Sequence, residues 1–353
     1  MKRLVVLILL SFMVACTLRS ASDAKPKLLD VVFSKAFPST SFVKVEFSRD
    51  GKSILATPYS DAVYVVDSED FSVTSLEIEG ILAQAGFIPN SNEIFVADRD
   101  SFVQLWDSNL KKRFSYRFPE RGKRASVSQD SKYIAYGGYL YDTSANKLLG
   151  EPIAHVDQSA LQFHGNDHVL SAGYWEQSVI MRNLTDDTRT VWRTDDRITA
   201  AAAIDNFIVA CTHDGDCYVW TISGDKPVHT ITGWDSVRFI ATHPREPIFA
   251  ISREDSVTVY SLRPFKRLLD IEASDLIRSL SLSENGIIAL GEDNGTIQMW
   301  DINKKALIGT YSVENEPIYG LAIDPKTSKL VAGTYKGKLL LLKANVESHG
   351  GTP

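Results

Sequence analysis

One short segment recurs eight times along this 353-residue chain, and it constrains the fold more than any other feature. The segment alternates apolar residues and ends in a polar residue, often just after Trp or Tyr. Its copies end at Asp67, Asp107, Asp142, Asn183, Thr221, Ser261, Asp301 and Lys343. Successive ends lie about 40 residues apart, and a fixed period of this length is typical of stacked repeats that bury their apolar faces against one another.

The rest of each repeat follows the pattern of an all-β protein. In each repeat a turn precedes the recurring segment; Asp214-Gly215 is an example from the fifth repeat. An apolar strand precedes the turn, as at residues 54–57 in the first repeat. A first strand ends in another turn, as at residues 47–51, and a fourth strand follows the segment, as at residues 306–311. Short apolar stretches separated by turn residues, without helical periodicity, predict strands. Each repeat is therefore predicted to be a four-stranded antiparallel sheet.

The repeat resembles the WD-repeat family, above all at its two Trp-Asp dipeptides, at positions 106–107 and 300–301. The resemblance implies an all-β, eight-bladed β-propeller that spans residues 28–346 as one domain, followed by a disordered tail over residues 347–353. The last copy lacks a fourth strand, and residues 28–33 can supply it, which would close the ring and protect its sheet edges. Because the third copy is short, a seven-bladed propeller with an irregular insert is the alternative.

The N-terminus has the order of a secretory signal. Lys2 and Arg3 precede an apolar run over residues 4–14, and small residues follow. The alternative is an N-terminal anchor helix, but the run is only about half of the ~20 residues that a membrane-spanning helix needs. The leader ends in the sequence MVAC at residues 13–16. This ending resembles the lipobox of bacterial lipoproteins, in which the Cys is diacylated and becomes the new N-terminus, although Met replaces the usual Leu.

The lipobox resemblance implies three boundaries. Residues 1–15 are then a signal peptide, Cys16 carries the lipid, and residues 16–27 form a polar tether. Several acyl chains on one residue hold a protein at a membrane durably. Cleavage further on, after Ala21 or Ala24, would discard Cys16 and is the alternative.

The lipobox and the charge of the chain also indicate its surroundings. Thr17, where Asp would favour the inner membrane, points by the resemblance to the outer membrane. We therefore expect a lipid-anchored protein of the bacterial envelope that faces the periplasm. The formal net charge is −6, and an acidic chain has no general attraction for phosphate backbones, so we expect no nucleic-acid partner.

Two further cysteines, Cys211 and Cys217, lie close together in the sequence. An exported protein meets an oxidising compartment, where disulfides persist. A bond between the two would staple a single hairpin, and it forms only if neighbouring strands present both Cβ atoms at bonding distance. The sequence leaves open both a Cys211–Cys217 disulfide and two buried free thiols.

No motif in the sequence carries recognisable chemistry. It contains no Gly-rich phosphate loop, no nucleophile elbow and no His pair at metal-ligand spacing on a helix. His164 and His168 are four residues apart, but they flank the turn at residues 165–167 and would not converge as they would on a helix. The HDGD run at residues 213–216 lacks the ligands of a calcium loop and is better explained as a hairpin turn. The expected inner strands, such as residues 43–47 and 200–204, are small and apolar. We therefore expect no catalytic residue, cofactor or metal. The alternative is a propeller enzyme or small-ligand binder in the central channel, which titratable side chains meeting at the channel mouth would favour.

The WD-repeat resemblance implies a polar network within each blade, and the chain keeps it only in fragments. His155 matches the family's loop His, but Trp175-Glu176 stand where its partner Asp belongs. Asp214 and Asp293 match that turn Asp, but the connecting loops of their blades lack the His. We expect apolar contacts between neighbouring sheets to carry more of the stability.

One group of side chains is a candidate for partner binding because it is aromatic. In a four-stranded blade, the turn between the second and third strands lies on the same face of the disc as the connection to the next blade. The aromatic residues in or beside these segments are Tyr59, Tyr174, Trp175, Trp234 and Tyr335. Aromatic side chains are enriched among interface anchors, so we interpret these five as a partner-binding face. The alternative is that each packs locally over its own blade.

A second group is basic and lies within one repeat. It comprises Lys111, Lys112, Arg113, Arg117, Arg121, Lys123 and Arg124. On an acidic protein this is a local positive stripe that could meet anionic lipid or an acidic partner. Solvated charge that deters pairing at an outer strand is the alternative.

By resemblance, WD-repeat proteins are docking platforms for other proteins. We therefore expect a non-catalytic, monomeric protein-interaction scaffold, held at the envelope membrane by its N-terminal lipid. The sequence does not identify the protein partner.

Overall fold

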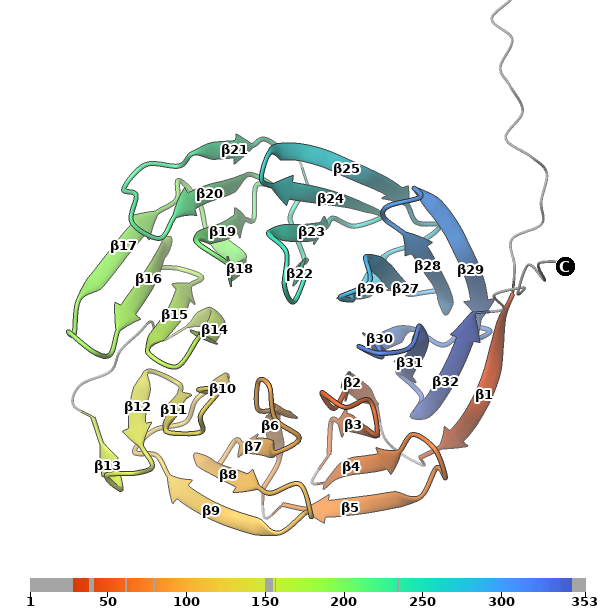
Figure 1. Ribbon diagram of the computed structural model, residues 1–353, viewed down its shortest axis with the longest axis horizontal. Helices are drawn as coiled ribbons and strands as arrows, with labels where there is room; N and C mark the ends of the chain where they lie inside the picture. The colour runs from red at the N-terminus through yellow and green to blue at the C-terminus, as the bar shows by residue number, and fades with distance from the viewer. Residues whose placement is uncertain are drawn as a thin grey trace, which may run out of the picture.

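The repeats fold as eight four-stranded antiparallel sheets arranged in a ring around a central channel (Figure 1). The computed structural model describes residues 28–37, 41–60, 62–78, 80–149, 155, 157–233 and 235–344. Each sheet is one blade, and its first strand lines the channel while its fourth lies at the rim. The prediction of eight four-stranded blades is confirmed, and the seven-bladed alternative is wrong.

The strands of the first four blades follow one another along the chain. Blade 1 consists of β2 (Phe42–Phe47), β3 (Ser53–Pro58), β4 (Ala62–Asp67) and β5 (Val73–Glu77). Blade 2 consists of β6 (Leu82–Phe87), β7 (Ile94–Asp98), β8 (Phe102–Trp106) and β9 (Lys112–Arg117). Blade 3 consists of β10 (Ala125–Val127), β11 (Tyr133–Tyr136), β12 (Tyr139–Asp142) and β13 (Lys147–Leu148). Blade 4 consists of β14 (Gln158–His164), β15 (His168–Gly173), β16 (Ser178–Asn183) and β17 (Arg189–Arg193). Blade 3 is short but complete, which explains the irregular third repeat.

The remaining blades follow the same order, except that the last one combines both ends of the chain. Blade 5 consists of β18 (Ile198–Ile204), β19 (Phe207–Thr212), β20 (Cys217–Thr221) and β21 (His229–Ile231). Blade 6 consists of β22 (Phe239–Thr242), β23 (Ile248–Ser252), β24 (Ser256–Leu262) and β25 (Phe265–Glu272). Blade 7 consists of β26 (Ile277–Leu282), β27 (Ile287–Glu292), β28 (Thr296–Asp301) and β29 (Ala306–Ser312). Blade 8 consists of β30 (Ile318–Ile323), β31 (Lys329–Thr334), β32 (Lys338–Ala344) and β1 (Leu29–Ala36).

The ring closes where β1 pairs with β32. The two strands run antiparallel, from Leu29 opposite Ala344 to Ala36 opposite Lys338. Leu29 is only 3% exposed and belongs to a core cluster shared with blade 7, whereas the adjacent Leu28 is 69% exposed. The predicted closing strand is therefore confirmed, and it begins one residue later and ends further on than the sequence indicated.

The core lies between neighbouring sheets, as the repeat pattern requires. All six residues of β27 are buried, because this strand has a sheet on each of its two faces. At the junction of blades 4 and 5, Trp192 and Trp220 are both nearly fully buried, and their ring centres lie 6.4 Å apart. Burying a side chain of this size stabilises the fold by about 2 kcal/mol or more, so adjacent blades depend on each other.

The inner strands also bond to one another around the channel. The backbone N–H of Phe87 donates to the Glu46 carboxylate at 3.0 Å, and that of Ala125 donates to the Gln84 side chain at 2.9 Å. The N–H of Phe163 donates to the hydroxyl of Ser126 in the same way, at 3.0 Å. Each inner strand is an edge of its sheet, so the backbone groups that face away from the second strand need partners from outside the blade. The expectation that inner strands are only small and apolar is therefore incomplete, because polar side chains satisfy this edge.

Cys211 and Cys217 face each other across β19 and β20 as register partners. Their sulfur atoms lie 2.04 Å apart, as a disulfide, and both residues are fully buried. Of the two arrangements that the sequence left open, the structure shows the hairpin staple.

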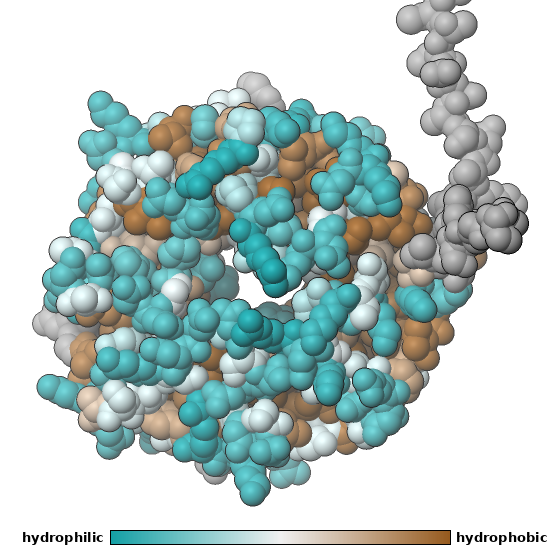
Figure 2. Space-filling view, in the orientation of Figure 1, coloured by the Kyte–Doolittle hydropathy of each residue, from teal (hydrophilic) through white to brown (hydrophobic). Residues whose placement is uncertain are grey.

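No helix among the described residues has the length and hydrophobicity needed to cross a membrane. The expected signal peptide over residues 1–15, the lipidation site Cys16, the tether over residues 16–27 and the tail over residues 347–353 lie outside the described residues. Figure 2 shows that the disc is hollowed at its centre and that hydrophilic side chains surround the opening.

Candidate functional site

The turns between second and third strands lie on one face of the disc together with the connections between blades; we call it the turn face. On this face, hydrogen bonds of Ser41 connect blade 8 to blade 1, where the ring closes. The backbone N–H of Tyr59 donates to the Ser41 carbonyl at 2.8 Å, and the Ser41 hydroxyl donates to the Tyr335 carbonyl at 2.6 Å. Tyr59 and Tyr335 thus flank the same loop and are 56% and 53% exposed. Of the other predicted aromatic residues, Trp234 lies outside the described residues.

Trp175 is the most exposed aromatic side chain among the described residues, at 63%. Its ring meets that of Tyr174 edge to face, with centres 4.9 Å apart. The guanidinium of Arg197 lies over both rings, 5.6 Å from the centre of Tyr174 and 5.5 Å from that of Trp175. Each such cation–π contact contributes about 0.5–1 kcal/mol at an exposed site, so the two rings are held in place while they face solvent.

The same arrangement of an arginine over an aromatic ring occurs twice more on the turn face. The Arg99 guanidinium lies 5.0 Å from the centre of the Tyr59 ring. That of Arg278 lies 5.4 Å from the Tyr319 ring, which in turn meets Tyr335 edge to face at 5.4 Å. Tyr59, Trp175 and Tyr335 therefore each belong to a cluster that includes an arginine from a neighbouring blade or its connection, although Tyr335 itself contacts Tyr319 of its own blade.

Sequence reasoning missed the arginines and Tyr319 because each contact joins two blades. Arg99 follows Tyr59, and Tyr319 follows Arg278, by about one repeat length, whereas local motif spacings are much shorter. A search for residues at matching positions of successive repeats could have paired them. Arg197 and Trp175 do not share such a position, and no sequence signal connects them.

His155 holds together the second and third strands of blade 4. Its two ring nitrogens each lie 2.9 Å from a serine hydroxyl, Nδ1 from Ser171 and Nε2 from Ser178. Burial lowers the pKa of His155 below its ordinary value, although the nearby Glu176 carboxylate opposes the shift. The neutral ring satisfies polar groups that would otherwise cost about 1–3 kcal/mol each. His155 therefore has the structural role that the resemblance implied, with Glu176 beside it in place of Asp.

In blades 5 and 7 an acidic side chain at the turn accepts a hydrogen bond from the connection to the next blade or from the preceding connection. The acceptor is a neighbour of Asp214 or Asp293, the residues that the resemblance indicated. Asp214 is exposed, and it is Asp216 that accepts a hydrogen bond from the Gly233 N–H at 3.0 Å. Glu292 is fully buried and accepts from the Ser274 N–H at 2.9 Å, while Asp293 is paired with an arginine. The assignments of Asp214 and Asp293 were therefore wrong by two positions and by one position, and the two turns also differ in length, with four residues between β19 and β20 and three between β27 and β28.

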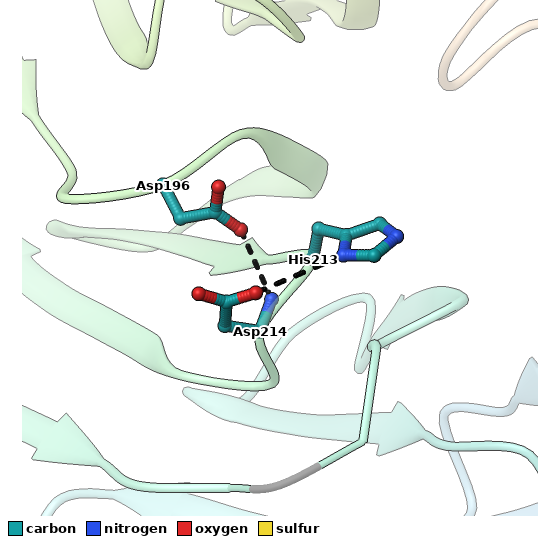
Figure 3. A group of neighbouring side chains, drawn as sticks. All are labelled: Asp196, His213 and Asp214. Atoms are coloured by element: carbon teal, nitrogen blue, oxygen red, sulfur yellow. Dashed lines mark hydrogen bonds and ion pairs between the residues drawn. The ribbon is translucent and has the colours of Figure 1, made fainter.

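Figure 3 shows the group of acidic and imidazole side chains that most resembles a cation site. Ligand atoms of Asp196, His213 and Asp214 lie within 4.8 Å of one another. However, the Asp196 carboxylate accepts the backbone N–H of Asp214 at 3.1 Å, and Nδ1 of His213 lies 3.8 Å from the Asp214 carboxylate. His213 and Asp214 are exposed, so these contacts are explained by a solvated turn that begins at Thr212.

The seven cations predicted as one stripe lie before, on and after β9. Lys112, Arg113 and Arg117 lie on β9 at the outer wall, and Lys111 is in the turn before that strand, on the face opposite the turn face. Arg121, Lys123 and Arg124 lie beyond β9, in the connection to β10 on the turn face. The predicted stripe thus follows the outer strand and then the loop, where the chain turns inward toward the channel after Phe118, which is buried.

Comparison with solved structures shows the fold alone. The chain is similar to the C-terminal WD40 domain of Sif2, with a TM-score of 0.76 and 13% sequence identity over 90% of this chain and 99% of that domain. It is also similar to the computationally designed Ika8 protein, with a TM-score of 0.74 and 17% identity over 90% of this chain and 100% of that chain. No protein-family description matches the sequence. No curated protein matches it either.

Proposed function

We propose that this WD40-type propeller is a non-catalytic scaffold that binds a protein partner on its turn face. The observation that carries the proposal is Trp175, 63% exposed yet fixed by Arg197 of the next interblade connection. An ordered, exposed aromatic ring loses little conformational freedom on binding, and such rings with nearby arginines are enriched among interface hot spots. The clusters at Tyr59 and Tyr335 extend this surface around the channel mouth.

The lipobox-like sequence that ends at Cys16 supports a second part of the proposal. A diacylated Cys16 would tether the propeller to the bacterial outer membrane on its periplasmic side, and a short polar tether would leave the turn face free to meet partners. Mass spectrometry of the mature N-terminus tests the anchor. The account requires a lipid-modified Cys16, and an unmodified start after Ala21 or Ala24 would rule the anchor out.

A capture experiment with matched variants tests the binding face. The full chain carrying Trp175→Ala and Tyr335→Ala is expected to lose stable capture of the partner from envelope membranes. The control carries Val191→Ala and Val228→Ala, which remove exposed apolar side chains at the outer strands of blades 4 and 5. Equal capture by both double variants would show that the turn face does not bind the partner.

A further inference from the structure

Two adjoining hollows open at the channel mouth on the turn face, over blades 1 to 4. One has a volume of about 430 Å³, and its charged wall residues are Lys44, Lys123 and Arg124. The other has a volume of about 520 Å³, and its charged wall residues are Arg99, Arg121 and Lys123. They share Ala83 and Lys123, and we call them together the cationic hollow. Five cations and no carboxylate or imidazole are found in its described walls, although the chain as a whole has a net charge of −6.

Three of the five cations of the cationic hollow are paired with carboxylates at its rim, and one of these pairs joins Lys44 to Glu46. Nζ of Lys123 lies 2.7 Å from the Asp157 carboxylate, but three quarters of the lysine side chain is exposed. The Arg121 pair with Asp100 is longer, at 3.3 Å, and also exposed. Exposed ion pairs contribute about 0–1 kcal/mol, so an incoming carboxylate can replace these partners at small cost.

Arg124 is the cation that most needs an additional partner. Its Nε donates to the backbone carbonyl of Gln158 at 3.1 Å, and no described carboxylate forms an ion pair with it. Arg124 is exposed, and partial desolvation of its guanidinium by the surrounding protein lowers the pKa of this group. The other N–H groups of this guanidinium have no hydrogen-bond partner among the described residues, and their fork geometry matches a carboxylate.

The wall also contains an unused hydrogen-bonding group. Thr57 is 3% exposed and lies opposite Lys44 in the register of β2 and β3. Its hydroxyl has no hydrogen-bond partner among the described residues. Buried polar groups normally have partners, so an unpaired hydroxyl beside the cations fits a wall that is completed by a ligand or by ordered water.

We infer that the cationic hollow binds an acidic segment of the protein partner, through the carboxylates of consecutive Asp or Glu residues. This inference rests on the proposed function, because the segment belongs to the protein that docks on the turn face. The cations are spread along two hollows and do not converge on one point, which suits a chain of carboxylates better than a single small anion. Arg99 also connects the hollow to the exposed Tyr59 ring, so the same partner can reach both.

An acidic hollow elsewhere on the turn face would give the partner an orientation. It lies across the turn face between blades 5 and 6, and its charged and titratable wall residues are His213, Asp214, Asp216, Asp235 and Glu254. A partner whose acidic segment entered this side would meet like charge, which costs affinity and suppresses the wrong orientation. The two hollows therefore favour a single alignment of the partner on the disc.

Binding of a rhodamine-labelled peptide of ten glutamates to the full-length protein in neutral detergent tests the inference. Lys44→Gln, Lys123→Gln and Arg124→Gln together are expected to weaken binding about tenfold or more, because they remove three charges from the walls. The matched control is Lys112→Gln, Arg113→Gln and Arg117→Gln, which removes the same charge from β9 and should change the affinity by less than about twofold. The exposed single change Lys123→Glu should weaken binding even if the first triple variant folds poorly.

Three results would overturn the inference. They are equal weakening by the β9 control, absence of glutamate-peptide binding, and displacement of the labelled peptide by inorganic phosphate at a lower concentration than by unlabelled peptide. The last result would assign the hollow to a small anion. Crosslinking of the partner from Trp175 is measured separately. Crosslinks without glutamate-peptide binding would reject only the acidic segment, whereas peptide binding without crosslinks would reject the proposed docking face.

Discussion

The guanidinium of Arg197 lies 5.5 Å from the centre of the Trp175 ring, although Trp175 belongs to the turn of blade 4 and Arg197 directly precedes the first strand of blade 5. The contact therefore fixes an exposed ring to the boundary between two blades. It contributes little to the stability of the ring of blades, since exposed cation–π contacts are worth about 0.5–1 kcal/mol. Its main effect is to order a surface that a partner can use.

Replacing Arg197 should separate binding from folding. Arg197→Met keeps the length of the side chain but removes the charge that holds Trp175 and Tyr174. We expect partner binding to weaken several-fold, while the apparent free energy of unfolding changes by less than about 1 kcal/mol. Denaturant titration and partner capture on the same sample check both values. A large loss of stability with unchanged capture would show that the contact serves the fold instead.

Closure of the ring can be tested with two adjacent leucines. Leu29→Ala removes a buried side chain from the junction of β1 with the core and should lower the apparent free energy of unfolding by about 2–5 kcal/mol. Leu28→Ala is the control, because Leu28 is 69% exposed and its loss should cost less than about 0.5 kcal/mol. Chemical denaturation compares the two variants, and equal effects would contradict a stabilising role for β1.

The disulfide between Cys211 and Cys217 should stabilise blade 5 modestly. The bond joins residues six positions apart, and closing so short a loop is worth roughly 2 kcal/mol in the chain-entropy treatment. We expect reduction to lower the denaturation midpoint of the wild-type chain. The double variant Cys211→Ala and Cys217→Ala should start from the lower midpoint and show no response to reductant. A wild-type midpoint that is unaffected by complete reduction would refute this contribution.

His155 should make stability depend on pH. Because burial lowers the pKa of the folded His155, its neutral form is favoured, and its contribution is fully present above the unfolded pKa of about 6.5. The contribution is lost as the pH falls below that value, since the unfolded chain then binds a proton that the folded chain excludes. His164, whose pKa is also lowered chiefly by burial, acts with the same sign.

The measurement compares the apparent free energy of unfolding at pH 7.5 and 5.5. The wild-type protein should lose stability on acidification, and His155→Gln should lose less, because one of the two histidines no longer contributes. An equal loss in both proteins would mean that His155 does not provide the effect. A gain in stability at the lower pH would contradict the sign of the shift.

The sequence predicted the fold well because the fold depends on a repeated pattern. Each of the eight recurring segments forms the third strand of its blade, and the closing strand was found from the missing partner of β32 alone. These features follow from alternation and period, which are local properties of the chain. The sequence did not decide between a disulfide and two free thiols, because it does not give the register that places Cys211 opposite Cys217.

The site was predicted less completely because its contacts join different blades. The sequence indicated that Tyr59, Trp175 and Tyr335 share a face, but not that Arg99, Arg197 and Arg278 order their surroundings. It placed the basic residues along an outer strand and its loop, but it did not show that the chain turns inward after Phe118 and brings Arg124 to the channel mouth. The cationic hollow combines Lys44 of blade 1 with Arg124 at the start of blade 3, a juxtaposition that the packing of successive blades around the channel creates.

Site-specific photocrosslinking in intact envelopes tests the central claim most directly. A photoreactive residue at Trp175 on the turn face is compared with one at Lys304, which is also exposed and lies in a turn on the opposite face. The account predicts a discrete crosslinked partner from position 175 and none from position 304. Crosslinks of equal yield from both positions, or from position 304 alone, would contradict the turn face as the binding surface.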